Sequence, residues 1–393
     1  MKKYIFLFCV CIFILGACSS NEETKSESRN QEQSVLESVD VTISPYDMQQ
    51  NYNVYLRNLM CELNDVYYFI MDTKIHFFDK KTNQMGVLCG KPECDHMTDS
   101  CNGHVIYDNF LASYDGKIYL ITSSEKGTEL YRVNPDGTGR EVVRELNSLS
   151  GMNGRVYLHR EHVYTSICNQ QVKNGKTSTT FEMYQYDLEN GKPDLLMTFT
   201  HEYIEVVHYH IIEDYIYFAM QYTESESSKL AIRIYDITSK SFVSEWEGEI
   251  KGRINNFIVK ENSLYFVQRI TGGNESALQI LQYDLESQQI KESKKMNDGP
   301  GTYHISRKYI HVVRSKTGTF FVMDYNGKIM EEGALVEGQQ DGNMVCRFIG
   351  EDGEALLYQC YKTTEDRLEI SVLKWTPQGV EIVGERNVVI GRQ

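Results

Sequence analysis

Asp115-Gly116-Lys117-Ile118-Tyr119-Leu120 combines a tight turn with an alternating strand that carries a tyrosine. The same pattern returns along the chain, and its copies begin at residues 65, 115, 161, 213, 261, 307 and 351. Acidic or turn-forming residues precede most of these strands, and Tyr, Ile, Val and Phe fill them, as expected of half-buried β-structure. Intervals of 44 to 52 residues indicate a repeat architecture rather than one large globule.

A second pattern alternates with the first, namely a short strand that ends in an aromatic or apolar residue and is followed by a turn. Its copies are Phe78-Asp79, Val133-Asn134, Tyr186-Asp187, Tyr235-Asp236, Tyr283-Asp284, Met323-Asp324 and Trp375-Thr376. Together the two patterns predict four antiparallel strands in every repeat, which is one blade of a β-propeller. The predicted fold class is therefore all-β, a seven-bladed β-propeller over residues 51–393. Six or eight blades are the alternatives, because the first and last copies match the pattern least well.

The composition agrees with a globular β-protein and excludes several other classes. The chain has 393 residues, 41% of them hydrophobic and 24% charged, with 27 Tyr against 6 Pro. These values argue against a disordered chain, a collagen and a polytopic membrane protein. The net charge of −15 argues against a nucleic-acid partner, because phosphate contacts need clustered basic residues. We interpret the many tyrosines as packing between blades, with an aromatic ligand platform as the alternative.

The N-terminus resembles the signal sequence of a bacterial lipoprotein. A basic start precedes an apolar run at residues 4–15 that is too short to remain as a membrane-spanning helix. The run ends in Leu15-Gly16-Ala17-Cys18, which resembles a lipobox. We therefore predict a signal peptide at residues 1–17 and lipidation of Cys18.

A polar segment follows the predicted lipid anchor. Residues 18–50 include the stretch SSNEETKSESRNQEQ and show no periodic apolar face, so we expect a disordered tether. The predicted location is the outer, extracytoplasmic face of the cell membrane, with the protein held there by its lipid.

Cysteines and a histidine cluster between the first and second predicted blades, in the segment 89–103. Cys89, Cys94, His96 and Cys101 follow the spacing C-x4-C-x-H-x4-C. Three thiolates and an imidazole complete the tetrahedral shell of one structural zinc ion and leave no position for substrate. The alternative is disulfide bonding, which suits an exported protein and in which Cys61 supplies a fourth cysteine. We predict that the segment lies on the face of the propeller that carries the long loops.

The lipobox, the tether, the tyrosine-rich repeats and the C-x-K-P-x-C-x-H-x4-C-N segment together resemble a family of Gram-positive surface lipoproteins. That family carries a domain of unknown function related to the YWTD-type receptor propellers and, more distantly, to TolB-like propellers. The resemblance covers nearly the whole chain and implies a surface propeller, but it carries over no activity. The YWTD motif itself is degenerate here, as in Ile118-Tyr119-Leu120-Ile121-Thr122.

Two further groups of residues invite a covalent or metal interpretation. Cys346 and Cys360 flank the turn at Asp352-Gly353 almost symmetrically, so they lie within disulfide reach if the register of the hairpin agrees. We interpret them as two buried unpaired thiols, with a disulfide as the alternative. His208 and His210 point the same way on an alternating strand, and we interpret them as a satisfied or solvated pair, with a metal pair as the alternative.

The sequence favours a binding or scaffold module over an enzyme. It contains no G-x-S-x-G, no H-E-x-x-H and no P-loop, and its acidic residues are spread along turns. Long loops expected at residues 169–180, 223–229, 271–277 and 362–367 would form a binding face for a protein, peptide or glycan. One alternative is an extracytoplasmic hydrolase or lyase with its site in the central channel. The other is an accessory subunit of an envelope transporter or sensor.

Overall fold

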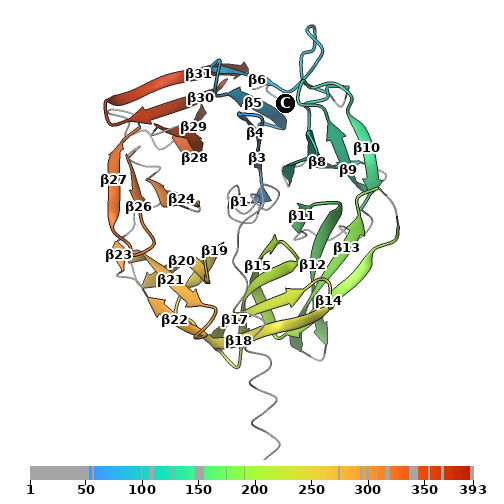
Figure 1. The fold of residues 1–393 in the computed structure, drawn as a ribbon, viewed down its shortest axis with the longest axis vertical. Coiled ribbons are helices and arrows are strands. Elements are labelled where there is room, and N and C mark those ends of the chain that lie inside the picture. The colour runs from blue at the N-terminus through green and yellow to red at the C-terminus, as the bar shows by residue number, and fades with distance from the viewer. Residues whose placement is uncertain are drawn as a thin grey trace, which may run out of the picture.

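Seven antiparallel sheets form a ring around a central axis (Figure 1). The computed structural model describes residues 53–389, apart from 55–56, 99, 106–109, 125–126, 147–154, 174, 190, 273–274, 293–294, 298–300, 307, 315–318, 336–343, 353–354 and 364–366. Across these residues the regular structure is entirely strand, which confirms the predicted all-β fold with seven blades. In this described part there is also no helix long and apolar enough to cross a bilayer. The predicted signal peptide, Cys18 and the tether lie outside it.

Each blade is built from consecutive strands, and the first of them lies nearest the axis (Figure 1). Blades 1 to 4 comprise β3 (Met60–Leu63), β4 (Val66–Met71), β5 (Lys74–Asp79) and β6 (Gln84–Val87); β7 (Leu111–Tyr114), β8 (Lys117–Ser124), β9 (Gly127–Val133) and β10 (Glu141–Glu145); β11 (Arg155–His159), β12 (His162–Lys173), β13 (Lys176–Asp187) and β14 (Asp194–His201); and β15 (Tyr203–Ile212), β16 (Tyr215–Glu224), β17 (Ser227–Asp236) and β18 (Ser241–Glu249).

The remaining strands follow the same order. Blades 5 to 7 comprise β19 (Arg253–Lys260), β20 (Ser263–Gly272), β21 (Glu275–Asp284), β22 (Gln289–Glu292) and the short β23 (Met296–Asn297); β24 (Gly301–Ile305), β25 (Ile310–Arg314), β26 (Thr319–Met323) and β27 (Ile329–Ala334); and β28 (Met344–Asp352), β29 (Ala355–Thr363), β30 (Arg367–Thr376) and β31 (Gly379–Val389). A separate two-stranded sheet, β1 (Asn53–Val54) with β2 (Arg57–Asn58), precedes the first blade.

The hydrophobic core is divided among the seven contacts between neighbouring blades. Each contact has its own cluster of buried side chains, and every cluster draws its members from two adjacent blades. Tyrosines of the second strands are buried in these clusters, among them Tyr68, Tyr119, Tyr164 and Tyr217. This confirms the interpretation of the tyrosine excess as packing, because a single blade buries neither face on its own.

Aspartates at the ends of the third strands stabilise the turns that follow. Asp79 Oδ1 accepts a hydrogen bond from the backbone N–H of Lys81 at 2.8 Å, and Asp236 Oδ1 accepts one from Thr238 at 2.8 Å. Asp187, Asp284 and Asp324 make the same kind of contact two or three residues ahead. A short carboxylate that bonds the backbone just ahead of it is what an Asx turn requires. The recurring aromatic–Asp pairs are therefore turn signals.

The segments expected to be long loops are paired hairpins instead. The β12–β13 ladder runs out to Lys173 opposite Lys176, and the β16–β17 ladder runs to Glu224 opposite Ser227. β20–β21 and β29–β30 extend in the same way over two of the other predicted loops. Continued pairing satisfies backbone groups that a loop would leave to water, even where the side chains are polar. In these four segments the described residues therefore form hairpins rather than irregular loops.

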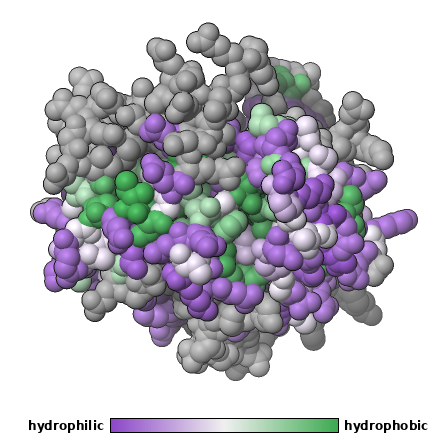
Figure 2. Space-filling view, turned by 90° about the horizontal axis from the view of Figure 1, so that it is seen from above, coloured by the Kyte–Doolittle hydropathy of each residue, from purple (hydrophilic) through white to green (hydrophobic). Residues whose placement is uncertain are grey.

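The outermost strands bring apolar side chains to the rim of the ring. Figure 2 views the side that lies at the top of Figure 1 and shows apolar patches between polar side chains. Exposed apolar residues of the outer strands include Val142 of β10 and Val380 and Ile382 of β31. The rim is therefore a mixed surface rather than a uniformly charged one.

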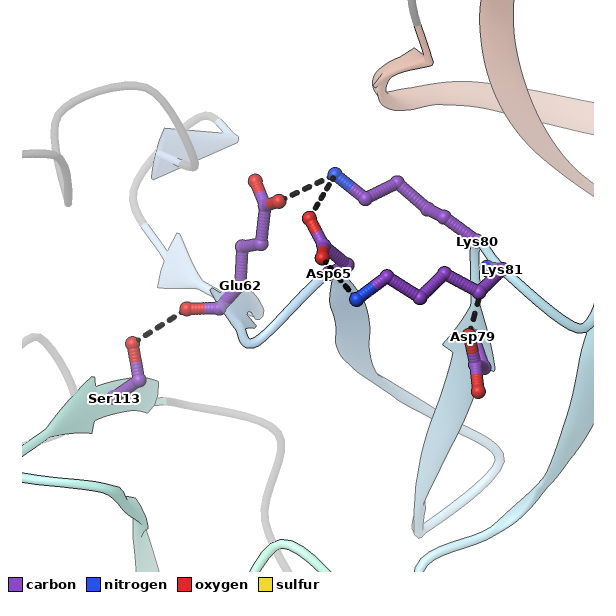
Figure 3. Close-up of polar contacts among 6 residues, drawn as sticks. All are labelled: Glu62, Asp65, Asp79, Lys80, Lys81 and Ser113. Atoms are coloured by element: carbon purple, nitrogen blue, oxygen red, sulfur yellow. Dashed lines mark hydrogen bonds and ion pairs between the residues drawn. The ribbon is translucent and has the colours of Figure 1, made fainter.

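A polar cluster joins the two turns at the tight-turn face of blade 1 (Figure 3). We use "tight-turn face" for the side that carries the turns between first and second strands and between third and fourth strands. Lys80 Nζ lies 2.6 Å from Glu62 Oε1 and 3.7 Å from Asp65 Oδ1, while Lys81 Nζ lies 2.8 Å from Asp65 Oδ2. Ser113 of blade 2 donates to the carbonyl oxygen of Glu62 at 2.8 Å. These contacts hold the two turns of blade 1 together and connect them to blade 2.

Candidate metal centre

The cysteine–histidine segment is an insertion in the outermost strand of blade 1. The N–H of Leu88 donates to the carbonyl oxygen of Ile75 at 2.8 Å, and the N–H of Ile75 donates to that of Gly103 at 2.8 Å. In an uninterrupted antiparallel strand, one residue opposite Ile75 would both donate its N–H to the carbonyl oxygen of Ile75 and accept the N–H of Ile75. Here the chain leaves the ladder after Leu88 and rejoins it at Gly103. We call the excursion at residues 89–102 the rim insert.

The rim insert projects from the outer edge of blade 1. The segment was expected on the face that carries the blade-to-blade connections, because it lies between two blades in the sequence. The structure places it at the outer edge of β5 and β6, and a loop extends there beyond the outline of the ring (Figure 1). Residues 103–105 return to pair beside the start of β5, so the fourth strand of blade 1 resumes after the insert.

Four potential ligand atoms come together within the rim insert. The sulfurs of Cys89, Cys94 and Cys101 and a ring nitrogen of His96 all lie within 4.8 Å of one another, and His96 Nδ1 is 3.3 Å from Cys101 Sγ. Tetrahedral zinc with these ligand types separates its donor atoms by roughly 3.5 to 4 Å. The four residues, here called the Cys3His cluster, therefore have the donor set and nearly the spacing of a closed zinc site.

The structure does not place Cys61 with this cluster. The three cysteines of the cluster carry thiols that are not joined in disulfides, and Cys61 is a buried thiol on β3. Burial raises the pKa of Cys61 well above its ordinary value, with the charge of Glu62 acting in the same direction. Cys61 is therefore a core residue of the contact between blades 1 and 2.

Backbone N–H groups already favour a thiolate at one position of the cluster. Burial opposes ionisation of Cys89, but hydrogen bonds from the N–H groups of Lys91 and Asn102 and from neighbouring thiols outweigh it and lower its pKa. Burial raises the pKa of the Cys101 thiol to about 12, together with hydrogen bonding to Cys89 and Cys94, although the N–H of Gly103 opposes this. Backbone N–H groups that donate hydrogen bonds to a cysteine sulfur stabilise its thiolate form, which is the form that binds a metal ion.

The turn between the third and fourth strands of blade 2 supports the rim insert. The carbonyl oxygen of Gly137 accepts the N–H of Gly90 at 3.1 Å and the side-chain amide of Asn102 at 2.7 Å. Arg140 donates to the carbonyl oxygens of Cys101 at 3.1 Å and His104 at 2.6 Å. The insert therefore joins blades 1 and 2 as well as gathering the four ligands.

The interpretation of Cys346 and Cys360 as unpaired thiols is wrong, and the alternative, a disulfide in blade 7, is what the structure shows. Cys346 of β28 and Cys360 of β29 are directly opposite in register, and their sulfurs are bonded. Both are buried in the core between blades 6 and 7. The register of the hairpin, which the sequence left open, is what brings them together.

The predicted histidine pair is buried in the structure and lies outside any metal cluster. His208 and His210 have no exposed surface, and His210 Nε2 donates to the carbonyl oxygen of Phe257 at 2.8 Å. The ring of His201 stacks on Tyr222 with centroids 3.9 Å apart. Over the described ranges, the Cys3His cluster is the one group of at least three metal-binding side chains that are close enough to share an ion.

A pocket of about 410 Å³ was not anticipated from the sequence. It opens on the tight-turn face between blades 3 and 4 and is lined by Tyr114, His159, Arg160, Glu161, His162, Tyr164, Gln185, Glu213, Asp214 and Ile237. Its residues come from three blades and are up to 123 positions apart, so no local motif announces it. The two histidines at the 159–162 turn were the only sequence signal.

Comparisons with known proteins find distant structural neighbours only. No family model matches the chain, and no curated protein matches its sequence. Similar solved structures include BamB from Moraxella catarrhalis, at 10% identity over 82% of each chain with a TM-score of 0.35. An oligogalacturonate lyase in complex with manganese shares 12% identity over 80% of this chain and 88% of its own, with a TM-score of 0.49. The β-propeller domain of the Trilobed protease from Pyrococcus furiosus shares 14% identity over 72% of this chain and 82% of its own, with a TM-score of 0.41.

Proposed function

We propose that the protein is a non-catalytic binding or scaffold propeller, held by a lipid on Cys18 at the extracytoplasmic face of the cell membrane. A zinc ion bound by the Cys3His cluster fixes the rim insert, which presents a contact surface to a protein partner. The observation that carries this proposal is the closed donor set, because four protein ligands leave a zinc ion no open position for substrate. Such an ion stabilises a loop rather than performing chemistry.

The surface of the rim insert suits contact with a partner. Lys91, Pro92, Glu93 and Asp95 are exposed, and Met97 exposes 56% of its surface. A flexible apolar side chain among charged residues adapts readily to a partner surface. Four ligands close together would hold this short segment without a hydrophobic core of its own.

The position of the N-terminal hairpin speaks against the alternative of catalysis in the central channel. β1 lies close to β24, an innermost strand, and appears near the axis of the ring in Figure 1. A segment of the chain in this position competes with a substrate for the same space.

Site-specific photo-crosslinking in the intact membrane tests the proposed contact. A crosslinking residue at Met97 should capture one defined protein, and the same residue at Lys81, in the turn at the other end of β5 and β6, should not. Replacing Cys94→Ser should abolish capture at Met97 by releasing the insert. Equal capture at both positions, or capture that survives Cys94→Ser, would contradict the proposal.

Membrane fractionation tests the anchor separately. Cys18→Ala should release the protein from the membrane, because the lipid has no other acceptor in the proposed maturation. Continued retention of the variant in the membrane fraction would refute lipid anchoring at this position.

A further inference from the structure

The pocket on the tight-turn face is built by the inner turns of adjacent blades. Its walls include the turn between β11 and β12 and the turn between β15 and β16. Arg160 and Glu213 hold left-handed backbone conformations there, with φ of 54° and 52°. The equivalent turns of other blades hold the same conformation, for example at Asp115 and Glu261, because a two-residue hairpin turn requires it. The pocket is therefore distinguished by the side chains that line it rather than by the backbone of its turns.

A tyrosine with its hydroxyl is among the residues that line the pocket. Tyr164 is 2% exposed. The charges of Arg160 and Asp214, which also line the pocket, act on that hydroxyl, and burial raises the pKa of Tyr164 well above its ordinary value. Tyr164 therefore keeps its proton, and its oxygen remains able to accept a hydrogen bond from a ligand.

The charges of the pocket select the sign of that ligand. Glu161, Glu213 and Asp214 provide three carboxylates against the single guanidinium of Arg160, which is itself paired with Asp214 at 3.0 Å. A ligand carboxylate or phosphate would add a further negative charge to this excess. A ligand ammonium group would instead find acceptors in the carboxylates and the face of an aromatic ring.

We propose that this pocket binds a small organic cation, an amine-bearing molecule of roughly hexosamine size. Glu161 receives the ammonium group, and the hydroxyl of Tyr164 accepts a hydrogen bond from the ligand. Tyr114 and Ile237 supply apolar walls for its carbon skeleton. This function goes beyond the proposed role of the rim insert and does not depend on zinc or on a protein partner.

Calorimetric titration of the full-length protein in detergent tests the proposal with matched probes. Glucosamine, N-acetylglucosamine and glucuronate share one ring and differ in charge, and putrescine carries amines without a ring. Glucosamine should bind at least tenfold more tightly than N-acetylglucosamine, and glucuronate should not bind. Binding of putrescine as well would assign the affinity to the amine, whereas a response to glucosamine alone would add the ring as a determinant.

Three variants locate the binding. Glu161→Gln should weaken glucosamine binding about tenfold, as expected for loss of a charge-assisted hydrogen bond. Tyr164→Phe should weaken it a few-fold while keeping the melting temperature near that of the wild type, because it removes the hydroxyl and leaves the buried ring in place. Glu381→Gln, on the outer strand β31, is the control and should bind as the wild type does.

The proposal is overturned if glucuronate or N-acetylglucosamine binds as tightly as glucosamine, or if no amine binds at millimolar concentration. Equal affinity of the wild type and Glu161→Gln would overturn it too. None of these results would alter zinc content or crosslinking at Met97, so failure of this proposal is distinguishable from failure of the proposed function.

Discussion

Gly137 of blade 2 lies directly against the backbone of the metal centre. Its φ of 79° lies in the left-handed region, and its carbonyl oxygen accepts the N–H of Gly90. A Cβ at this position would lie 2.6 Å from the backbone nitrogen of Cys89. Backbone cannot yield as a flexible side chain does, so a methyl group here displaces a ligand residue.

Replacing Gly137→Ala should therefore weaken zinc retention. We expect the chelator concentration that removes half of the metal to fall about tenfold, as for other changes just outside a ligand shell. The left-handed backbone should by itself cost about 1 kcal/mol in the free energy of unfolding. Metal release can be followed with a colorimetric chelator.

Gly116→Ala is the matched control for this prediction. Gly116 has a φ of 70°, but no atom lies within 4 Å of the Cβ it would gain. The control should show the backbone cost alone and retain zinc as the wild type does. Equal loss of zinc from the two variants would show that the contact with Cys89 is unimportant.

Sequence spacing identified the donor set of the Cys3His cluster but not its surroundings. The four ligands lie within 13 residues, so local spacing predicts that they can meet. The hydrogen bonds from Asn102 and Gly90 to Gly137 cross between two blades, and no local pattern encodes them. Likewise, the bond between Cys346 and Cys360 depends on the register of a hairpin, which their spacing alone did not decide.

Among the repeated elements, the turn after the third strand shows how one carboxylate stabilises a blade. The backbone N–H of Ser287 lowers the pKa of the Asp284 carboxyl below its ordinary value of 3.8, and the Ser287 hydroxyl and the charge of Lys291 act in the same direction against burial. A carboxyl whose pKa is lower in the folded state stabilises that state above the unfolded pKa. This stabilisation is lost as the pH falls through the folded value, below 3.8.

Asp284→Asn should lower stability at neutral pH and flatten its dependence on acid. Because the turn is partly exposed, we expect the loss to stay below about 1 kcal/mol. Asp284→Ala, which also removes the acceptor oxygen, should cost more. Urea midpoints measured at neutral pH and below pH 3.8 check both points; an acid dependence as steep as that of the wild type in Asp284→Asn would contradict the assignment.

At the scale of elements, strands were more predictable from sequence than connections. Every quoted tyrosine-strand repeat is the second strand of a blade, and every aromatic–turn pair ends a third strand. The connections differed from the predicted loops for a physical reason. Polar residues, such as those of β12 and β13 between Cys168 and Phe181, continue a strand ladder when a partner strand is present. Composition alone does not show that partner. The same difficulty hid the return of residues 103–105 to β5.

The whole ring closes through side chains rather than through a shared strand. Each blade uses strands consecutive in sequence, so in the described part of the chain no sheet joins the first strands to the last. The contact between blades 7 and 1 is a cluster that includes Tyr67, Phe69, Ile349 and Val372. Gly350 lies against Tyr67, and a Cβ there would come within 2.1 Å of the phenol ring.

Gly350→Ala should therefore destabilise ring closure. Overpacking a filled core costs typically 1 to 3 kcal/mol, and we expect a loss of about 2 kcal/mol or more. Gly384→Ala, whose Cβ would lie 3.2 Å from the Cβ of Met85 in the same contact, should cost less. Thermal unfolding measures both. Equal melting temperatures for Gly350→Ala and the wild type would show that this contact does not hold the ring closed.

Sequence periodicity favoured seven blades, with six or eight as alternatives, but did not indicate the way in which they close. Seven copies at nearly regular intervals predict seven equivalent units, and the structure has seven. Closure depends on which strands pair where the first and last blades meet. The repeat pattern in the sequence is the same whether one blade combines strands from both ends of the chain or every blade uses consecutive strands. The pocket between blades 3 and 4 likewise arises only once three blades are placed side by side.

The central claim is that the Cys3His cluster holds one structural zinc ion, and metal analysis combined with thiol counting tests it most directly. The protein purified without added metal should carry about one zinc per chain, and three thiols should become reactive only after chelation. Cys94→Ser should abolish zinc binding, whereas Ser100→Ala in the same insert should not. A metal-free protein in which these cysteines are oxidised to disulfides would contradict the claim.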